Sequence, residues 1–434
     1  MSYFIKPCRK IQATLNLPGD KSISHRAVIF SSIAKGRTKI KNFSFSDDCR
    51  TTLNAFKLLG VKIKKATKDK ISVCGVGVRG LRKPKHKINL AESGTSMRIL
   101  MGLLSAQNFT TKLDAHSSLR KRPMLRVIKP LRLMGANIKA KTKDRDEYPP
   151  IMISPAKLRP LNWKMTVASA QVKSAILLTG LYAKGETTIN EPVKSRDHTE
   201  RMLKKFKARI RVKGKTISIK ASNLVSPKEI NIPVDISSAA FFMVLTCLLK
   251  NSSVKIRNLG LNPSRAGVIE VLKKMGANIK IIRSRRQYFE PMADVVIKSS
   301  KLKAVRITKD KIPTLIDELP ILMVAAALAK GKSVFEGVRE LRVKETDRIK
   351  SMKLNLSRMG VKIESKLKNK REIIIIHGRD SLRGVKLRSF GDHRTAMSMI
   401  VAGLLADSQS RIDDIKCINK SFPDFLKIIK RITR

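Results

Sequence analysis

The segment from Leu17 to Arg26 holds a dense cluster of side chains that could do chemistry. Lys21, Ser22 and Arg26 fall on the first turns of a predicted helix, and Ser22 and Arg26, four apart, share one face. A hydroxyl, an ammonium and a guanidinium beside the free N–H groups of a helix start can cradle a phosphate or a carboxylate. The segment lacks the pattern of a Walker loop. Taken alone, these cations also fit a solvated helix start.

A second cluster places three cations and two carboxylates within residues 342–348. Lys344 and Arg348 are four apart, so we expect both to reach one anion while Glu345 points elsewhere. A carboxylate held among cations suits proton transfer. An exposed ion-pair turn is the simpler alternative.

Three further groups stand beside predicted helices. Asp317 and Asp392-His393-Arg394 occupy two helix starts, where an Asp is most often only an N-cap, and Asp235 is interpreted as such a cap. Arg120-Lys121-Arg122-Pro123 forms a basic loop, for which a solvated loop is the alternative.

These polar groups recur at a regular interval. Six times a polar cluster opens into a nearly all-apolar stretch, which is typical of a buried helix. The openings are Gly19-Asp20-Lys21-Ser22, Glu92-Ser93-Gly94-Thr95, Ala168-Ser169-Ala170-Gln171, Asp235-Ile236-Ser237-Ser238, Asp317-Glu318 and Gly391-Asp392-His393-Arg394. The small turns that follow lie near Gly36, Phe109, Gly185, Ser252, Gly331 and Ser408, 67 to 79 residues apart. This period predicts one supersecondary unit used six times, with several helix starts facing one anionic ligand.

A second recurring element is a helix that ends at a glycine and continues as a strand. Gly60, Gly135, Gly276 and Gly360 hold this position, and a degenerate copy at 205–210 lacks the glycine. Glycine here is the residue that ends a helix in a left-handed turn. We therefore expect an α/β fold of two similar domains, each with three repeat units, buried helices and outer sheets. One domain is placed at 21–234 and the other at 1–20 plus 235–434.

Composition limits the functional classes. Lys and Arg number 92 against 33 Asp and Glu, which gives a net charge of +59 and could indicate a nucleic-acid partner. The cations are spread along the whole chain and aromatics are only 4%, so an anionic small substrate is favoured. No apolar run is long enough for a membrane span, and five widely spaced cysteines favour reduced thiols over disulfides or zinc. We expect a cytoplasmic enzyme without metal or cofactor.

Six motifs together resemble the EPSP synthases of the enolpyruvyl transferase family. They occur in the family's order, at 17–26, 93–98, 119–123, 342–348, 392–394 and 420–424, and the similarity covers essentially the whole chain. The resemblance implies two domains of three βαββαβ units each, which close on substrate like a clamp. It implies the transfer of the enolpyruvyl group of phosphoenolpyruvate to the 5-hydroxyl of shikimate 3-phosphate, with release of phosphate, by a monomer.

The resemblance also assigns roles to residues. It implies that shikimate 3-phosphate is bound by Lys21, Ser22, Arg26, Ser169, Gln171, Asp317 and Lys344. It implies that phosphoenolpyruvate is bound by Lys21, Gly94, Arg122, Gln171, Arg348, Arg394 and Lys420. Asp317 and Glu345, with Lys21, match the residues of proton transfer. The physics agrees, because two substrates bring roughly five negative charges together and require fixed cations.

The sequence departs from the family pattern at two positions. Glu92 stands where an Asn is usual, so an acid either points away from the anion site or weakens binding, and Glu340 also replaces an Asn. Arg196 is a further candidate contact for the shikimate phosphate. The related transferase that acts on UDP-N-acetylglucosamine carries a loop cysteine that 114–122 lacks. A basic repeat protein that binds RNA is the alternative from a different class.

Overall fold

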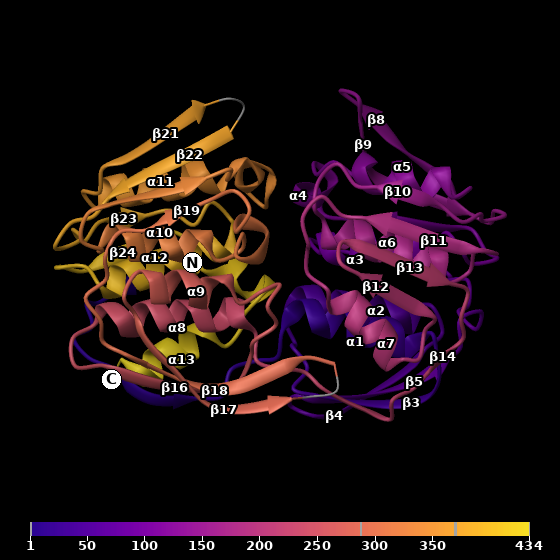
Figure 1. Cartoon of the computed structure of the whole chain (residues 1–434), viewed down its shortest axis with the longest axis horizontal. Coiled ribbons are helices and arrows are strands. Elements are labelled where there is room, and N and C mark those ends of the chain that lie inside the picture. Colours follow the sequence, from indigo (N-terminus) through magenta and orange to yellow (C-terminus); the bar gives the residue numbers. More distant parts are fainter. Residues whose placement is uncertain (1, 287–288, 369–370, 434) are drawn as a thin grey trace. The chain divides into compact units, whose positions relative to one another are not determined.

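The computed structural model describes residues 2–286, 289–368 and 371–433. The chain packs into two compact units (Figure 1). Unit 1 comprises Met1–Pro18, Pro233–Gln287 and Pro291–Arg434, and unit 2 comprises Gly19–Ile232 and Tyr288–Glu290. Each unit has its own hydrophobic core.

Unit 2 contains three sheets that share one strand order. In each, a short strand runs parallel to a second strand, which is followed by an antiparallel pair. The first sheet joins β14 (Leu224–Val225) and β15 (Glu229–Asn231) to β3 (Ala34–Lys41), β5 (Lys70–Val76) and β4 (Lys62–Thr67). The second is β6 (Ile88–Asn89), β7 (Thr111–Asp114), β9 (Asp146–Ser154) and β8 (Asn137–Lys143). The third is β10 (Asn162–Lys164), β11 (Glu186–Asn190), β13 (Thr216–Lys220) and β12 (Ile210–Lys213).

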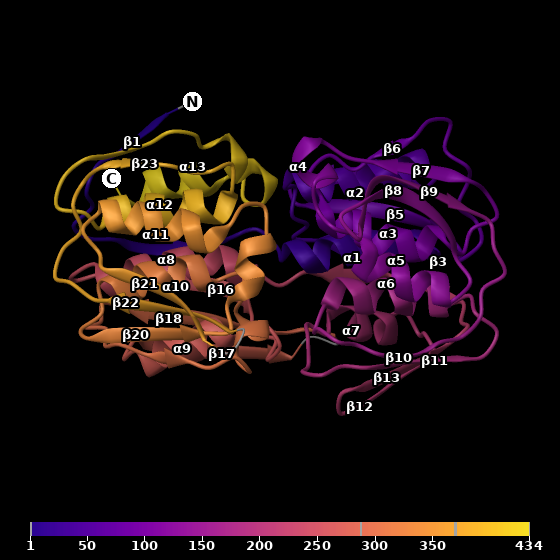
Figure 2. The same cartoon turned by 90° about the horizontal axis from the view of Figure 1, so that it is seen from above.

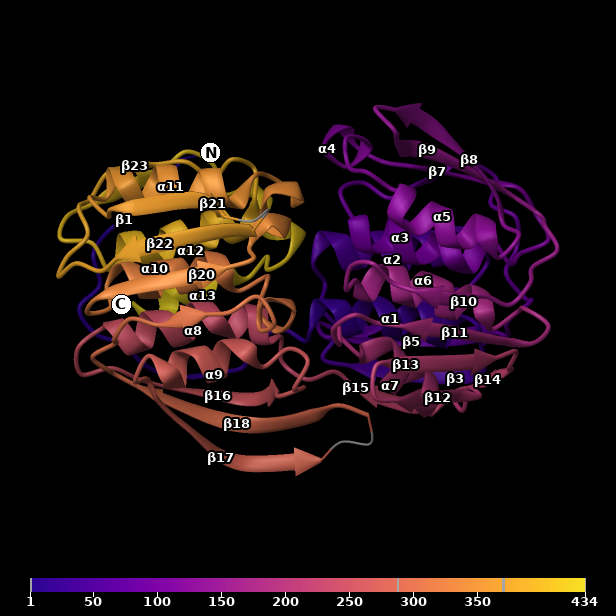
Figure 3. The same ribbon diagram turned by 45° about the horizontal axis from the view of Figure 1, so that its top comes forward.

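Unit 1 repeats this order twice and varies it once. The regular sheets are β2 (Gln12–Leu15), β16 (Ser253–Gly260), β18 (Pro291–Lys298) and β17 (Asn278–Arg286), and β19 (Arg306–Ile307), β20 (Lys332–Glu336), β22 (Arg371–His377) and β21 (Ile363–Lys368). In the third, β23 (Lys386–Leu387) and β24 (Ser410–Ile412) are completed by the N-terminal β1 (Tyr3–Ile5). Figure 2 shows β1 beside α12 (His393–Leu404), and Figure 3 shows β16, β18 and β17 side by side.

The helices are of two kinds, as the sequence predicts. The buried helices follow the six polar openings: α1 (Lys21–Ser32), α3 (Gly94–Leu104), α6 (Ala170–Gly180), α8 (Ile236–Leu248), α10 (Leu319–Ala327) and α12. The amphipathic helices are α2 (Asp47–Leu58), α5 (Leu125–Leu133), α7 (His198–Lys205), α9 (Gly267–Lys274), α11 (Arg348–Arg358) and α13 (Phe425–Ile432). Short helical turns are α4 (Ser117–Arg120), η1 (Ile312–Thr314), η2 (Arg339–Val343) and η3 (Lys416–Lys420). The buried helices lie inside the sheets of each unit, so the α/β prediction of two similar domains is confirmed.

The glycines after the outer helices adopt the expected left-handed conformation. Gly60, Gly135, Gly276 and Gly360 have φ angles between 86° and 93°. In the degenerate copy Lys207 takes this position with a φ of 63°. Gly36 differs from the prediction, because it lies inside β3 and the turn that ends α1 comes earlier.

No helix among the described residues is long and apolar enough to cross a bilayer.

Candidate active site

In unit 2, the start of α1 is capped and carries an ion pair. The Asp20 carboxylate accepts a hydrogen bond from the Ile23 amide at 2.8 Å, which fixes the first turn. Lys21 extends its ammonium to Asp48 of α2, with Nζ 2.6 Å from Oδ2, and both side chains are largely buried. Lys21 is therefore held toward α2 by a counter-ion that an anionic ligand would compete with.

Arg26 is buried in a network of neutral acceptors. Its Nη1 donates to the Ser22 carbonyl at 3.0 Å, its Nε to Thr199 Oγ1 at 2.7 Å and its Nη2 to Ser174 Oγ at 2.8 Å. Burial lowers the pKa of Arg26 to about 10, and the negative charge of Glu200 opposes this change. Ser22 and Arg26 lie one turn apart in α1, and the contact between them is to the Ser22 backbone carbonyl.

The N-terminal ends of α3 and α6 come together around Gln171. Gln171 Oε1 accepts from Arg98 Nη1 at 2.9 Å, and its Nε2 donates to Thr95 Oγ1 at 2.9 Å. Gly94 lies against the guanidinium groups of Arg98 and Arg122, because a Cβ built on it would be 2.8 Å from Arg122 Nη1 and 3.1 Å from Arg98 Nη1. A side chain at Gly94 would require the end of the Arg122 side chain to shift.

Ser169 is the N-cap of α6 and accepts a hydrogen bond from the Val172 amide at 3.4 Å. Its hydroxyl therefore stands at the same helix end as Gln171. Such an end offers unpaired N–H groups to an anion.

Arg120 and Arg122 of the basic segment at 120–123 make different contacts. Arg120 donates through Nε and Nη2 to Asp114, at 2.9 and 2.8 Å. Burial acts to raise the pKa of Asp114, but the hydrogen bonds from Arg120 and Lys87 outweigh it and hold the pKa well below its usual range. Arg120 is thus occupied by a structural ion pair, whereas Arg122 lies against Gly94.

Two further candidates, Arg196 and Glu92, also lie in unit 2. Arg196 is close enough to Arg26 for its positive charge to lower the pKa of Arg26. Glu92 immediately precedes Ser93, the N-cap of α3, and its carbonyl accepts from the Gly94 amide at 3.0 Å. Glu92 therefore adds a negative charge next to the N-terminal end of α3.

In unit 1, Asp317 lies between η1 and α10 among three guanidinium groups. Its Oδ1 is 3.5 Å from Arg348 Nη1, and its Oδ2 is 3.8 Å from Arg394 Nη2 and 3.9 Å from Arg265 Nη1. The helix cap is Glu318. Asp317 is thus part of a charged cluster.

Arg348 is the centre of that cluster. It is 1% exposed, and it donates from Nε to Asp392 at 2.9 Å and from Nη2 to Glu345 at 2.6 Å. Burial would lower the pKa of Arg348, but the charges of Asp392, Glu345 and Asp317 outweigh it and raise the pKa. The expectation that Glu345 points elsewhere is wrong, because its carboxylate pairs with Arg348.

The helical spacing assumed for Lys344 and Arg348 is also wrong. The 3-10 turn η2 ends at Val343, Lys344 is extended, and α11 begins only at Arg348. Burial lowers the pKa of Lys344, and the charges of Asp317 and Glu340 oppose this. Lys344 is still close enough to Asp317 for that charge to act on its pKa, although it is not on the helix that the spacing assumed.

Arg394 and Lys420 meet the start of α12. Arg394 donates from Nη1 to the Asp317 carbonyl at 2.9 Å, and its amide donates to the Asp392 cap at 2.8 Å. Lys420 Nζ is 3.5 Å from the Gly391 carbonyl. Unit 1 therefore gathers Asp317, Lys344, Glu345, Arg348, Arg394 and Lys420 around two neighbouring helix starts.

Sequence reasoning missed three residues of these clusters. Arg98 lies four residues after Gly94, so its helix face was readable from the sequence. For Asp48 and Arg265, no spacing or motif in the sequence indicated a place in these clusters. Arg265 is buried and donates from Nη2 to Ser237 at 2.5 Å, across 28 residues of chain.

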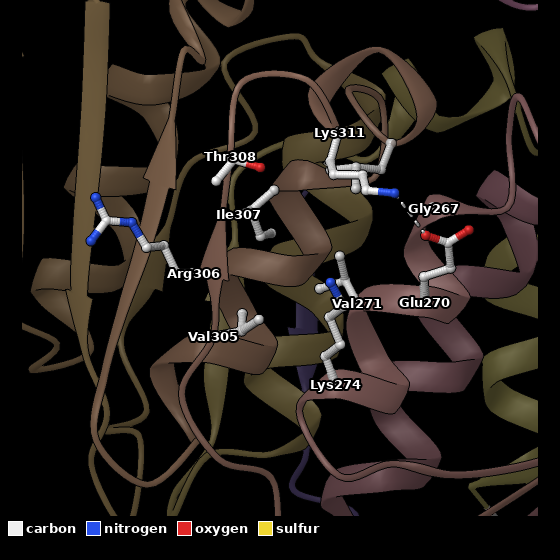
Figure 4. A pocket seen from close by; sticks show the side chains of 10 residues that line it. Gly267, Glu270, Val271, Lys274, Val305, Arg306, Ile307, Thr308 and Lys311 are labelled. Atoms are coloured by element: carbon white, nitrogen blue, oxygen red, sulfur yellow. Dashed lines mark hydrogen bonds and ion pairs between the residues drawn. The ribbon is translucent and has the colours of Figure 1, made fainter.

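A separate small cavity in unit 1 lies between α9, β19 and the residues on either side of η1 (Figure 4). Lys274, Arg306 and Lys311 line it with the carboxylate of Glu270, which is 3.5 Å from Lys311 Nζ. None of the predicted site residues lines this cavity.

Comparisons with known proteins agree over the whole chain. A family model described as EPSP synthase (3-phosphoshikimate 1-carboxyvinyltransferase) matches residues 5–429. A 3-phosphoshikimate 1-carboxyvinyltransferase from Petrotoga mobilis is 47% identical over 435 aligned positions, covering 100% of this chain and 99% of the relative. One from Desulforamulus reducens is 43% identical, with 100% and 99% coverage.

Solved structures give the same fold. EPSP synthase from Acinetobacter baumannii superposes with a TM-score of 0.88 at 40% identity, covering 99% of this chain and 98% of that one. The enolpyruvyl transferase NikO from Streptomyces tendae has a TM-score of 0.79 at 16% identity, covering 99% and 96%, which shows the fold alone. With a whole-length family match and relatives above 40% identity, the chain belongs to the EPSP synthase family.

Proposed function

We propose that the residue clusters of the two units act on the same pair of substrates. As a member of the EPSP synthase family, the chain is an enzyme of aromatic amino-acid biosynthesis. It transfers the enolpyruvyl group of phosphoenolpyruvate to the 5-hydroxyl of shikimate 3-phosphate and releases phosphate.

Unit 2 is proposed to hold both anionic groups. Lys21, Ser22, Arg26, Ser169 and Gln171 bind shikimate 3-phosphate, and Gly94, Arg122 and Gln171, with Lys21, bind phosphoenolpyruvate. The approach of Arg122 to Gly94 and the network around Arg26 support these roles. Guanidinium groups fixed before the ligand arrives need little reorganisation to stabilise its charge.

Unit 1 is proposed to supply proton transfer and the remaining contacts. Asp317 accepts the proton of the 5-hydroxyl as its oxygen bonds to C2 of phosphoenolpyruvate. Glu345, with Lys21, donates a proton to the methylene carbon. The tetrahedral intermediate then loses phosphate and a methyl proton, which restores the double bond. Lys344 orients the ring, while Arg348, Arg394 and Lys420 bind phosphoenolpyruvate.

The observation that carries this assignment is the link between the two carboxylates. Arg348 contacts Asp317 at 3.5 Å and Glu345 at 2.6 Å. One buried cation thus holds a proton acceptor and a proton donor close together, and it is itself a ligand for an anion.

Two further assignments are part of the proposal. The domains are 21–234 on the phosphoshikimate side and 1–20 plus 235–434 for proton transfer. The protein acts as a cytoplasmic monomer without a nucleic-acid partner, and its five free cysteines support a reducing compartment.

Ligand stabilisation tests the substrate assignment. Shikimate 3-phosphate together with glyphosate should raise the melting temperature by several degrees at saturation, because a ligand that binds only the folded state stabilises it. RNA should give no such shift that survives added salt. A shift with RNA alone would contradict the proposal.

A further inference from the structure

Unit 2 contains a lysine that is completely enclosed by protein. Lys173 of α6 has an exposed fraction of 0%. Its Nζ lies 2.9 Å from Glu191 Oε2 and 2.6 Å from Glu200 Oε1, and both carboxylates are buried. Charged side chains are almost never fully buried unless they are paired, so the fold holds these three charges together specifically.

The two carboxylates come from different segments. Glu191 follows β11 and also anchors the loop after it, because its Oε1 accepts from the Ser195 amide at 3.1 Å and from the Ser195 hydroxyl. Glu200 belongs to α7. Lys173 therefore ties the 191–197 loop and α7 to α6.

The residues next to the triad in sequence are those that hold Arg26. Ser174 follows Lys173, and Thr199 precedes Glu200. Arg26 donates to both of their hydroxyl groups, at 2.8 and 2.7 Å, and these hydroxyls are 2.6 Å apart. A shift of α7 relative to α6 would break this pair of acceptors.

The triad of Lys173, Glu191 and Glu200 also acts on the charge of Arg26. Glu200 acts on Arg26 through space, since its charge raises the pKa of Arg26 against the effect of burial. Burial raises the pKa of Glu200, and the ammonium of Lys173 opposes this change.

We propose that Lys173 is a positioning residue for the binding of shikimate 3-phosphate. Through Glu191 and Glu200 it fixes the loop that carries Arg196 and the helix that presents Thr199 to Arg26. Ser169, the N-cap of α6, stands at the start of the helix that carries Lys173. This inference rests on the proposed function, in which these residues contact the substrate.

Two variants test the inference. Glu191→Gln leaves the ion pair of Lys173 with Glu200, whose net charge is zero, and should fold. We expect this variant to raise KM for shikimate 3-phosphate roughly three- to tenfold. The triple variant Lys173→Met, Glu191→Gln, Glu200→Gln removes all charge while keeping volume, and should raise that KM at least tenfold. In both, KM for phosphoenolpyruvate and kcat should change less than about threefold.

A matched control separates positioning from stability. The exposed Arg132 and the buried Glu147 form a bidentate pair elsewhere in unit 2, with Nη2 2.7 Å from Oε2. Arg132→Met with Glu147→Gln should lower the melting temperature without changing either KM.

The outcomes distinguish this inference from the proposed function. If the wild-type chain turns over but Glu191→Gln and any folded triple variant keep its KM for shikimate 3-phosphate, the positioning role is wrong. If the wild-type chain neither binds shikimate 3-phosphate nor releases phosphate, the proposed function itself fails.

Discussion

The clusters of the two units organise their cations in different ways. In unit 2, Arg26 donates to hydroxyls and a carbonyl, and Arg98 donates to the amide of Gln171. In unit 1, Arg348 pairs with three carboxylates, and Arg394 lies within 4 Å of two. A cation with neutral partners keeps its charge for an incoming anion, whereas a cation among carboxylates fixes those carboxylates in place.

The difference suggests a division of labour. Unit 2 is suited to hold the phosphate of a ligand, because Arg26 is positioned by hydrogen bonds to hydroxyls and a carbonyl. Unit 1 is suited to move protons, because its carboxylates are held by ion pairs in defined positions. Substitutions in unit 2 should therefore act mainly on KM, and substitutions of acids in unit 1 should act mainly on kcat.

The largest effect is expected from the acids of unit 1. Asp317→Ala and Glu345→Gln should each lower kcat at least about 100-fold, because each removes a group that we propose for proton transfer. Steady-state phosphate release measures this. Asp380→Asn, an exposed acid in the same unit, is the control and should retain wild-type turnover. Wild-type kcat in both Asp317→Ala and Glu345→Gln would refute the assignment.

Arg26→Ala should have the next largest effect. It removes the charge-assisted hydrogen bonds that we propose to the ligand, so KM for shikimate 3-phosphate should rise about 10- to 100-fold while kcat at saturation changes less. The exposed Arg211→Ala in the same unit should leave both constants unchanged. A fall in kcat with no change in KM would contradict the division between the units.

Lowering the pH should reduce the stability of unit 2 through His25. This side chain is fully buried, its Nδ1 is 2.6 Å from Thr52 Oγ1, and burial together with Lys21 and Arg26 lowers its pKa well below 6.5. The unfolded chain gains a proton on this group below about pH 6.5 and the folded chain does not. The free energy of unfolding should therefore fall by up to about 1.4 kcal/mol per pH unit from this group as the pH drops through that range.

Urea unfolding at several pH values measures this slope. His25→Gln should reduce it by about one proton's contribution, whatever its effect on stability at neutral pH. An unchanged slope in this variant would assign the acid sensitivity to other groups.

The smallest effect concerns the helix-to-strand turns. Unit 1 has glycine in both, at Gly276 and Gly360, whereas one turn of unit 2 holds Lys207 at a φ of 63°. This conformation costs an L-residue about 1–2 kcal/mol. Glycine avoids that cost, but part of the gain is offset because glycine gives the unfolded chain more conformational entropy. Lys207→Gly should raise the free energy of unfolding by about 0.5–1 kcal/mol.

Gly135→Ala, at the equivalent turn of the same unit, should have the opposite sign. An added Cβ would lie 2.6 Å from the Lys157 carbonyl. Denaturation curves of both variants decide this, and a destabilised Lys207→Gly would show that the lysine makes contacts worth more than its strain.

The sequence predicted the repeat and the helix starts because both depend on local patterns. Apolar periodicity and capping residues act within one or two turns of helix. The orientation of Glu345 was mispredicted because the spacing argument assumed a helix where the chain is extended after Val343. Lys173 could not be predicted, because a buried lysine and a solvated one look alike in a chain with 92 Lys and Arg.

The contacts of Arg265 show the same limit. Its partners Ser237 and Glu318 are 28 and 53 residues away, so only the tertiary fold brings them together. Charged networks of this kind are set by packing between repeat units and leave no periodic trace in the sequence.

Phosphate release with both substrates tests the central claim most directly. We predict that release requires shikimate 3-phosphate and phosphoenolpyruvate together, that excess shikimate 3-phosphate restores it in Arg26→Ala, and that no concentration restores it in Asp317→Ala. Release from phosphoenolpyruvate alone, or full rescue of Asp317→Ala by substrate, would contradict the account.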